Sequence, residues 1–172
     1  MPYHVCAKGF LKLMLSKNLK LDALVNLIKK EKKAGKQVVF TNGCFDIMHA
    51  GHVRYLDAAR SEGDLLVVGL NSDESVKNIK GSKRPVVLQK FRAQVLAGLQ
   101  SVDYITVFNE PDPLKLIMAI NPDVLVKGAD WDADNIIGAD FVRSNHGKVV
   151  TIPLVRDIST TNIIKKILRL YA

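Results

Sequence analysis

The stretch from residue 38 to residue 52, VVFTNGCFDIMHAGH, constrains the fold more than any other part of the sequence. It begins with a compact apolar run, Val38 to Phe40, as expected of a strand that is covered on both faces. Asn42-Gly43 ends this run, and Val53, Leu56 and Ala59 then recur at helical spacing. The stretch therefore predicts a buried strand, a turn of small residues and the start of a helix.

Two histidines lie at the predicted entry of this helix. His49 and His52 are three residues apart, so both rings can project from one side of the first turn. Gly51 between them and Gly43 at the strand end present no side chain that would block a ligand. Unpaired backbone N–H groups and the helix dipole favour an anion at such a position. The pattern predicts a phosphate site in which catalysis depends on positioning and electrostatic stabilisation.

Two other interpretations of the histidines are open. They could be surface residues that cap the helix, although two histidines around a glycine directly after a buried strand make this the weaker interpretation. They could also form a zinc site with Cys44. The spacing matches no common zinc pattern and offers no obvious fourth ligand, so phosphate binding is preferred.

The rest of the chain alternates between apolar runs and helical patterns, which predicts a parallel, doubly wound, Rossmann-like α/β sheet of five strands. The predicted strands cover residues 38–40, 65–70, 104–108, 124–126 and 149–152. Helices are expected at residues 20–34, 88–99 and 114–120, and the helix that begins at the two histidines is expected to end near Gly63. A last helix should follow the Ser159–Thr161 cap, with Ile163, Ile164, Ile167 and Leu168 facing inward. The basic stretch from Lys77 to Arg84 is expected to form a mobile loop or a short helix over the site.

Length and composition favour one domain in a reducing cytoplasm. The chain has 172 residues, and we expect residues 1–18 to be a flexible leader and residues 19–172 to be a single domain. Cys6 and Cys44 lie far apart, which argues against a disulfide framework. The net charge of +8 fits nucleic acid, an anionic membrane surface or phosphorylated small molecules. No basic stripe interleaved with aromatic residues occurs and no apolar run approaches roughly 20 residues, so neither nucleic acid nor a membrane is expected as a partner.

Polar groups follow four of the predicted elements where each meets the carboxyl edge of the sheet. They are the two histidines and the segments 71–73, 127–131 and 159–161. Open α/β sheets bind ligands at this edge. The hydroxyl run Ser159–Thr161 begins a second helix, which is another natural phosphate site, although one of the hydroxyls is expected to cap the helix.

The segment TNGCFD at residues 41–46, followed by HAGH at residues 49–52, resembles the signature of the cytidylyltransferase-like nucleotidyltransferases. Segments 81–86, 102–103, 121–128 and 158–164 resemble one branch of them, the heptose 1-phosphate adenylyltransferases. That branch also occurs as the C-terminal domain of bifunctional ADP-heptose synthases. This chain is too short to hold their sugar kinase, so it resembles a stand-alone form.

The resemblance implies a reaction. The phosphate of D-glycero-D-manno-heptose 1-phosphate attacks the α-phosphorus of ATP, pyrophosphate leaves, and ADP-heptose forms for the lipopolysaccharide core of bacteria. The nucleophile is already an anion, so no general base is needed. The expected partners are ATP and the sugar 1-phosphate, with Mg²⁺ arriving with ATP and no metal ligand from the protein. A homodimer is a further expectation.

The resemblance also implies roles for individual residues. The implied catalytic residues are His49, His52 and Lys165. The implied nucleotide and phosphate ligands are Asn42, Gly43, Cys44, Phe45, Gly51, Lys127, Gly128, Asp130, Ser159, Thr160 and Thr161. The implied ligands of the substrate phosphate are Asp46, Lys80, Lys83, Arg84 and Arg92.

Several of these roles have structural alternatives. Asp46 could instead brace the turn by accepting backbone N–H groups, and Arg92 could instead form an internal ion pair. Lys80 and Lys83 could simply be solvated, and Trp131 could pack rather than stack on a ring. His146 is interpreted as a surface turn residue.

Two rival functions remain, and a third is set aside. Residues 128–131 also resemble glycerol-3-phosphate and ethanolamine-phosphate cytidylyltransferases, which would consume CTP on the same scaffold. A nucleotide-binding regulator without catalysis is the rival from another class. A fragment of a class I aminoacyl-tRNA synthetase is set aside because an anticodon-binding region does not fit in this length.

Overall fold

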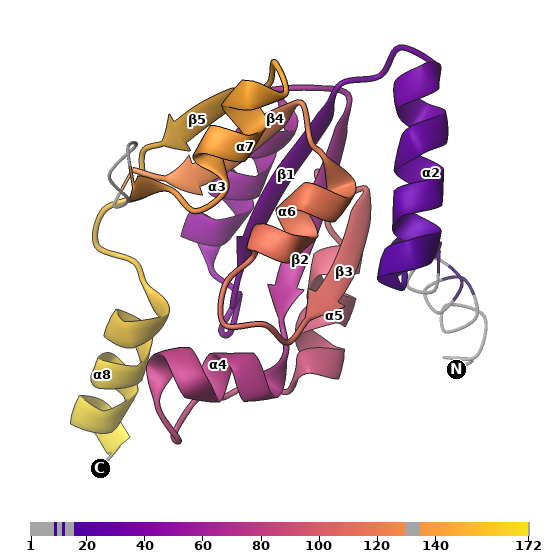
Figure 1. Cartoon of the computed structure of the whole chain (residues 1–172). Helices are drawn as coiled ribbons and strands as arrows, with labels where there is room; N and C mark the ends of the chain where they lie inside the picture. The colour runs from indigo at the N-terminus through magenta and orange to yellow at the C-terminus, as the bar shows by residue number, and fades with distance from the viewer. Residues whose placement is uncertain (1–8, 10–11, 13–15, 130–134, 172) are drawn as a thin grey trace.

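In the computed structural model, residues 9, 12, 16–129 and 135–171 are described. They contain a five-stranded sheet in the order β3-β2-β1-β4-β5, with all paired strands parallel (Figure 1). This confirms the predicted fold. The strands are β1 (Val38–Gly43), β2 (Leu65–Asn71), β3 (Tyr104–Phe108), β4 (Val124–Gly128) and β5 (Lys148–Ile152).

Helices cover both faces of the sheet. One buried cluster packs α2, α6 and α7 on one face, and a second packs α3 and α5 on the other. The described helices that follow residue 20 are α2 (Leu21–Lys33), α3 (Ala50–Arg60), α4 (Asp73–Lys80), α5 (Gln89–Ala97), α6 (Leu114–Ile120), α7 (Ala139–Ser144) and α8 (Thr160–Tyr171).

The central strand β1 is apolar on both faces because helices cover it on both sides. Val38 and Phe40 point into the cluster with α2 and α6, while Val39 points into the cluster with α3 and α5. All three are fully buried. Burial of each such side chain contributes roughly 1.5–3 kcal/mol, so the run that first identified the strand is also a main source of its stability.

The strand order places the end of β1 where ligands bind in sheets of this kind. From β1 the chain adds β2 and β3 on one side, and then crosses back to add β4 and β5 on the other. Ligands of open α/β sheets bind at the carboxyl ends of the strands beside this reversal. The segment that follows Gly43 lies at this point.

The described part of the predicted leader contacts the domain. Lys17 Nζ donates to the carbonyl of Leu99 at 2.9 Å, and Asn18 forms a parallel bridge with Ile105 of β3. The packed part of the chain therefore begins before residue 19. The rest of the predicted leader stays a prediction.

Two helices differ from the sequence predictions. The inward orientation predicted for Ile167 and Leu168 is wrong, because they are 48% and 58% exposed. Ile163 and Ile164 are half-buried, and no residue of α8 is fully buried. Helix α7 was not predicted. The Lys77–Arg84 stretch divides between the last turn of α4 and a loop.

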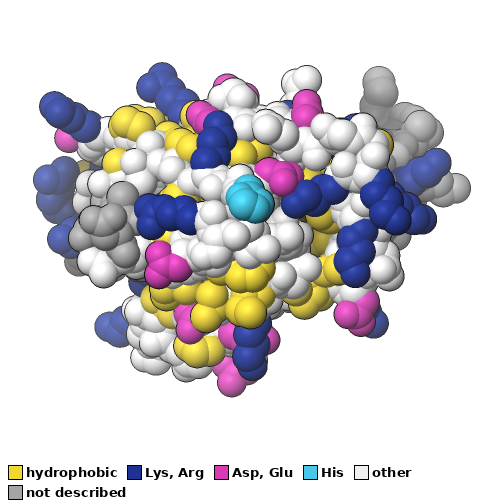
Figure 2. All heavy atoms as spheres, turned by 45° about the horizontal axis from the view of Figure 1, so that its top comes forward, with side chains coloured by type: hydrophobic (Ala, Val, Ile, Leu, Met, Phe, Trp, Pro, Cys, Tyr) yellow, Lys and Arg dark blue, Asp and Glu magenta, His cyan; other side chains and the backbone are white. Residues whose placement is uncertain are grey.

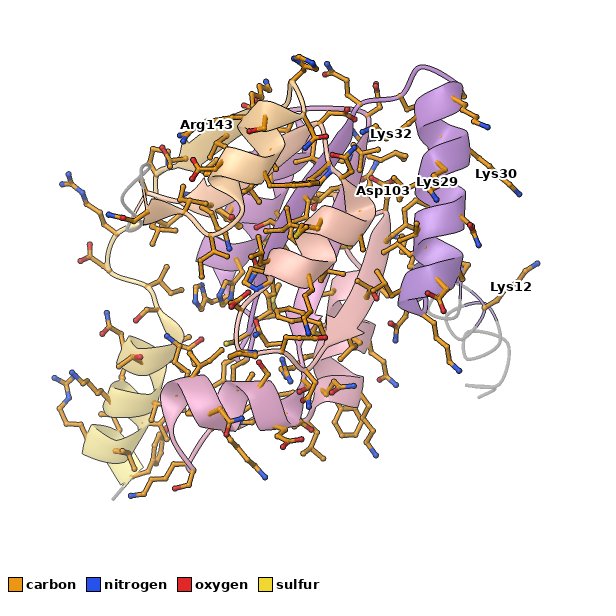
Figure 3. All side chains as sticks on the ribbon, viewed as in Figure 1. Lys12, Lys29, Lys30, Lys32, Asp103 and Arg143 are labelled. Atoms are coloured by element: carbon orange, nitrogen blue, oxygen red, sulfur yellow. The ribbon has the colours of Figure 1, made fainter. Side chains whose placement is uncertain are left out.

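Lysines at the end of α2 behave in two ways. Lys29 and Lys30 are exposed, and Lys30 points away from the sheet (Figure 3). Lys32 instead donates to the carbonyl of Asn121 at 2.7 Å and pairs with Asp123 at 2.9 Å. Helix α2 is thereby tied to the end of α6. Among the described helices, none has both the length and the apolar character that a membrane span requires.

Candidate active site

The segment from residue 42 to residue 52, called the histidine turn below, connects β1 to α3. His49 is the N-cap residue of α3, and its carbonyl accepts the N–H of His52 at 2.9 Å. Phe45 has a positive φ of 44°, and its ring is buried beneath the turn. A Cβ at Gly43 would lie 3.0 Å from Cε2 of that ring, so a larger residue would displace Phe45. Gly43 and Phe45 therefore set the path of the turn together.

The two histidine rings stack on each other. Their centroids are 3.8 Å apart and their planes differ by 21°. The ring of Phe45 meets His52 edge to face at 5.4 Å. A Cβ at Gly51 would lie 3.0 Å from Cε1 of His49 and 3.3 Å from Cγ2 of Ile158. A side chain at position 51 would therefore push the rings out of this arrangement.

Both histidines are held in the neutral form. Burial lowers the pKa of His49, and burial together with the charge of His49 lowers the pKa of His52 to about 4. The Nδ1 atoms of both rings are buried without a hydrogen-bond partner in the described part of the chain. Unsatisfied buried polar atoms are rare in folded proteins. Their presence here fits a pair of rings that is completed by an anionic ligand.

Asp46 is engaged inside the protein. Its side chain is 1% exposed and accepts the backbone N–H groups of Val86 and Val87 at 2.8–3.0 Å and Nε of Arg84 at 2.5 Å. Burial alone would raise the pKa of this carboxyl, but these hydrogen bonds hold it below the usual range. The carboxylate holds the loop after α4 against the histidine turn. This arrangement favours the structural alternative over contact with substrate.

Arg92 is also used internally. Its side chain is fully buried and donates to the carbonyl of Cys44 at 2.5 Å, to the carbonyl of Val87 at 2.9 Å and to Asp73 at 2.9 Å. It joins α5, the start of α4 and the histidine turn. The interpretation of Arg92 as a ligand of substrate phosphate therefore has no support here, since its donors already serve the protein.

The basic residues after α4 surround the turn more loosely. Lys80 and Lys83 are exposed. Arg84 uses Nε for Asp46, and the described residues supply no partner for its terminal nitrogens. Burial raises the pKa of the Cys44 thiol, while the charges of Lys80, Arg92 and Arg84 partly oppose this rise. Three positive charges therefore lie close enough to the turn to act on a bound anion.

The zinc alternative finds no support. Cys44, His49 and His52 are all described residues, yet no group of three His, Cys, Asp or Glu side chains among the described residues could hold a metal ion.

The ends of β1 and β4 are joined by a buried lysine. Lys127 is 7% exposed, and its Nζ donates to the Asn42 side chain. Behind them the hydroxyl of Tyr55 in α3 lies 2.7 Å from Oγ1 of Thr41 and donates to the carbonyl of Val126 at 3.2 Å. Sequence reasoning missed Tyr55, because a tyrosine one turn after a histidine motif carries no signal of its own.

The start of α8 lies beside the histidine turn. Oγ1 of Thr160 donates to the carbonyl of Ile47 at 3.3 Å, and Oγ of Ser159 accepts the N–H of Asn162 at 3.1 Å. Ser159 is thus the predicted capping residue. Thr161 and Lys165 are exposed on the first turns of the same helix. The structure therefore brings Thr160 to the histidine turn.

The other two predicted segments contribute differently. Asn71 donates to Ser75 at 2.9 Å, and Ser72 bonds to Asn109, so the end of β2 is held by an internal network. Gly128 ends β4. Asp130 and Trp131 lie outside the described residues.

A cavity of about 430 Å³ opens at the opposite, amino edge of the sheet. Figure 2 shows this end of the molecule, where a histidine lies among basic side chains. Three lysines line the cavity, Lys32, Lys36 and Lys148, and each pairs with a carboxylate at 2.7–2.9 Å. The lysine charges are therefore neutralised. His146 also lines the cavity and is exposed with φ of 63°, which confirms that it is a surface turn residue.

Comparison with known proteins agrees with this geometry. A protein family described as "Cytidylyltransferase-like" matches residues 40–166, a range that contains the histidine turn and most of α8. The chain is a cytidylyltransferase-like protein. The resemblance seen in the sequence is thereby confirmed at the level of the family.

The curated relatives of this cytidylyltransferase-like protein include bifunctional proteins named HldE. Those of Geobacter sulfurreducens and Geobacter metallireducens are 54% and 52% identical to it over 151 residues, which is 88% of this chain and 31% of each relative. HldE of Methylobacillus flagellatus is 50% identical over 147 residues, 86% of this chain and 30% of the relative. The chain thus spans about a third of the length of these relatives.

Solved structures give the same fold. The lipopolysaccharide core biosynthesis protein of Thermoplasma volcanium superposes with a TM-score of 0.59 at 27% identity, covering 70% of this chain and 98% of that one. The pantoate-beta-alanine ligase of Francisella tularensis superposes with a TM-score of 0.61 at 16% identity, covering 89% and 79%. The second likeness concerns the fold alone.

Proposed function

We propose that this protein is an adenylyltransferase that transfers AMP from ATP to D-glycero-D-manno-heptose 1-phosphate, giving ADP-heptose and pyrophosphate for the lipopolysaccharide core. The observation that carries the proposal is the similarity to part of HldE, which is 52–54% identical over 88% of this chain. The histidine turn is intact in this chain. The structure described as a lipopolysaccharide core biosynthesis protein supports the same pathway.

The reaction requires positioning rather than a base. A phosphate oxygen of the sugar 1-phosphate attacks the α-phosphorus of ATP, and the bond between the α-phosphorus and the bridging oxygen of the β-phosphate breaks. No proton has to leave the nucleophile. His49 and His52 are proposed to donate hydrogen bonds to the phosphate oxygens as negative charge moves onto the pyrophosphate. The hydroxyls of Thr160 and Thr161 and the ammonium of Lys165 are proposed to contact the same phosphates from the start of α8.

The sugar phosphate is proposed to meet Lys80, Lys83 and the terminal nitrogens of Arg84, whose fork suits a phosphate. The nucleotide is proposed to lie against Asn42, Lys127 and Gly128 at the ends of β1 and β4. Asp130 is a further ligand in this proposal. Asp46 and Arg92 are assigned to positioning, because their polar atoms already serve the loop and the turn.

Mg²⁺ is proposed to arrive bound to ATP. The described side chains do not fit a resident metal, since Asp46 is the buried carboxylate nearest the turn and its oxygens already accept hydrogen bonds from Arg84, Val86 and Val87. A cytoplasmic location and a homodimer are further parts of this proposal.

Pyrophosphate release tests the function. The purified protein is given Mg²⁺ with ATP or CTP, each paired with heptose 1-phosphate, glycerol 3-phosphate or ethanolamine phosphate. We expect release with ATP and heptose 1-phosphate only. Release with CTP and either of the other substrates would overturn the substrate assignment in favour of a cytidylyltransferase. Nucleotide binding without release from any pair would favour a regulator.

Three alanine variants test the site. His49→Ala and His52→Ala are each expected to lower kcat by roughly 10²–10³-fold, the typical cost of losing a donor that stabilises charge in the transition state. His146→Ala is the matched control, because this histidine is exposed at the opposite edge of the sheet. Equal losses in all three variants, or no loss in the first two, would remove the histidine turn from the mechanism.

A further inference from the structure

Helix α8 divides sharply into two faces. Its apolar side chains fall within one half of the helix circumference, at 100° per residue, and the basic side chains fall on the other half. The helix contains no Asp or Glu. The apolar face comprises Ile163, Ile164, Ile167, Leu168, Leu170 and Tyr171, and the basic face carries Lys165, Lys166 and Arg169.

The protein does not cover this apolar face. Ile163 and Ile164 are half-buried near the start of the helix, but Leu168 and Leu170 are each 58% exposed, and Tyr171 is 84% exposed. Figure 1 shows α8 standing off the sheet at one side of the molecule. Single exposed apolar residues are ordinary, whereas a contiguous apolar stripe along two turns marks an interaction surface.

The charge of the helix and of the chain selects the partner. Two copies that met through α8 would bring together helices whose charged residues are all basic, and these would repel each other, so the proposed homodimer would use another surface. A surface of anionic lipid headgroups would attract the same helix. Helices with an apolar face, a Lys and Arg-rich polar face and modest overall hydrophobicity lie in the interface of a bilayer, with long basic side chains reaching up to the headgroups.

We propose that the apolar face of α8 docks this protein onto a bilayer surface that carries anionic lipid headgroups. The expectation of no membrane partner was based on the lack of a run long enough to span a bilayer. The proposed docking does not require the chain to cross the bilayer, so that expectation does not apply to it. The face that inserts is the outer part of α8, beyond the turn at which Thr160 contacts the histidine turn. The docking is independent of the proposed reaction.

Vesicle flotation with the full chain tests the docking. One set of vesicles contains phosphatidylcholine alone, and the other contains phosphatidylcholine and phosphatidylglycerol in equal parts. The apolar variant is Leu168→Gln/Leu170→Gln, and the charge variant is Lys166→Gln/Arg169→Gln. Lys165 is left unchanged because it belongs to the proposed active site. The controls are Leu154→Gln, an exposed apolar residue outside α8, and Lys29→Gln/Lys30→Gln on the outer part of α2 (Figure 3).

We expect the unaltered chain to float with the anionic vesicles and to stay behind with phosphatidylcholine. The charge variant should weaken binding by roughly thirtyfold and the apolar variant by at least about tenfold, with the controls close to the unaltered chain. Added salt should weaken binding further. Because all substituted residues are exposed, we expect the variants to melt at the same temperature as the unaltered chain. An unchanged melting temperature would show that weaker binding reflects lost docking and not misfolding.

Three results would overturn the proposal. Equal binding by the α8 variants and the unaltered chain, with loss in the Lys29/Lys30 control, would assign binding to general positive charge. Absence of flotation together with dimers that dissociate in the apolar variant would assign the face to a second copy. Absence of flotation together with hydrogen exchange of α8 that slows only when ATP is added would assign it to closure on the protein's own body.

Discussion

At the scale of single residues, the charge state of the stacked histidines determines what the proposed ATP substrate would meet. With a pKa of about 4, His52 is neutral near neutral pH, because burial and the neighbouring His49 disfavour its cation. A triphosphate placed against the rings favours the cation instead. The free enzyme and the ATP complex should therefore differ in protonation.

We predict that ATP binding takes up protons at about pH 6. The binding enthalpy measured by titration calorimetry should vary with the ionisation enthalpy of the buffer, with an uptake of up to about one proton. His52→Gln should reduce this uptake, and His146→Ala should leave it unchanged. Identical enthalpies in all buffers would show that the triphosphate does not charge the histidine turn.

The same pKa shifts predict how stability depends on pH. The folded pKa of His52 lies below its unfolded value, so the folded state binds fewer protons than the unfolded chain and stability falls as pH drops from about 6.5 to about 4. The depressed pKa of Asp46 adds stability that is present above about pH 4 and is lost at lower pH. We expect urea unfolding to show that His52→Gln weakens the pH dependence of stability between about pH 6.5 and 4. Asp46→Asn should weaken the pH dependence below about pH 4. A profile unchanged by either variant would contradict these assignments.

Asp46 should also be a large single contributor to stability at neutral pH. Asp46→Asn removes the charge that pairs with Arg84 and sets an amide against two backbone donors, which we expect to cost about 3 kcal/mol of the free energy of unfolding. Asp140→Asn is the control, since that side chain is 99% exposed beside Arg143 and should change stability by less than about 0.5 kcal/mol. Similar losses in the two variants would mean that the buried carboxylate is not the anchor of the loop.

At the scale of elements, Arg92 joins α4, α5 and the histidine turn through one side chain. Arg92→Lys cannot reproduce three divergent contacts, so we expect a loss of about 2–4 kcal/mol in the free energy of unfolding. Arg54→Lys, at an exposed position of α3, should be nearly neutral. Unfolding midpoints in urea compare the two. A neutral Arg92→Lys would show that the turn is held by other contacts.

The helices and strands that were predicted well from the sequence are those whose apolar residues are arranged by burial against the core. The apolar runs of β1 and β2 and the spacing of Leu24 and Ile28 in α2 all report a face that the core covers. Helix α7 is too short for a period to appear, and it follows Gly138 in the left-handed region. For α8 the helical period was predicted correctly, but the apolar face was expected to pack against the core. An amphipathic pattern does not show which surface covers its apolar face.

The candidate site was predictable to a similar degree. Local signals found the histidines, the glycines between them and the hydroxyl cap, since each depends on a few adjacent residues. The pairing of Asp46 with the loop at residues 84–87, and of Arg92 with Cys44, joins segments about 40 to 50 residues apart. Such contacts follow from the tertiary arrangement, which spacing along the chain does not encode.

At the scale of the whole molecule, α8 is structurally peripheral and functionally central. A chain that stops after Ile158 should keep its melting temperature within about 4 °C, because no residue of α8 is buried. It should nevertheless lose pyrophosphate release, because the proposed phosphate ligands Ser159–Thr161 and Lys165 leave with the helix. A large drop in melting temperature, or retained release, would contradict this separation.

The strand order also bears on how the chain is made. During synthesis β1 emerges early and can pair with β2 soon afterwards, but its other neighbour, β4, ends only at residue 128. Until then one edge of the central strand β1 has no partner, and a parallel pairing across so long a loop forms slowly. The nascent chain therefore carries an unpaired apolar edge from residue 43 to residue 128, about half of its length, and such an edge is prone to aggregation until β4 has been made.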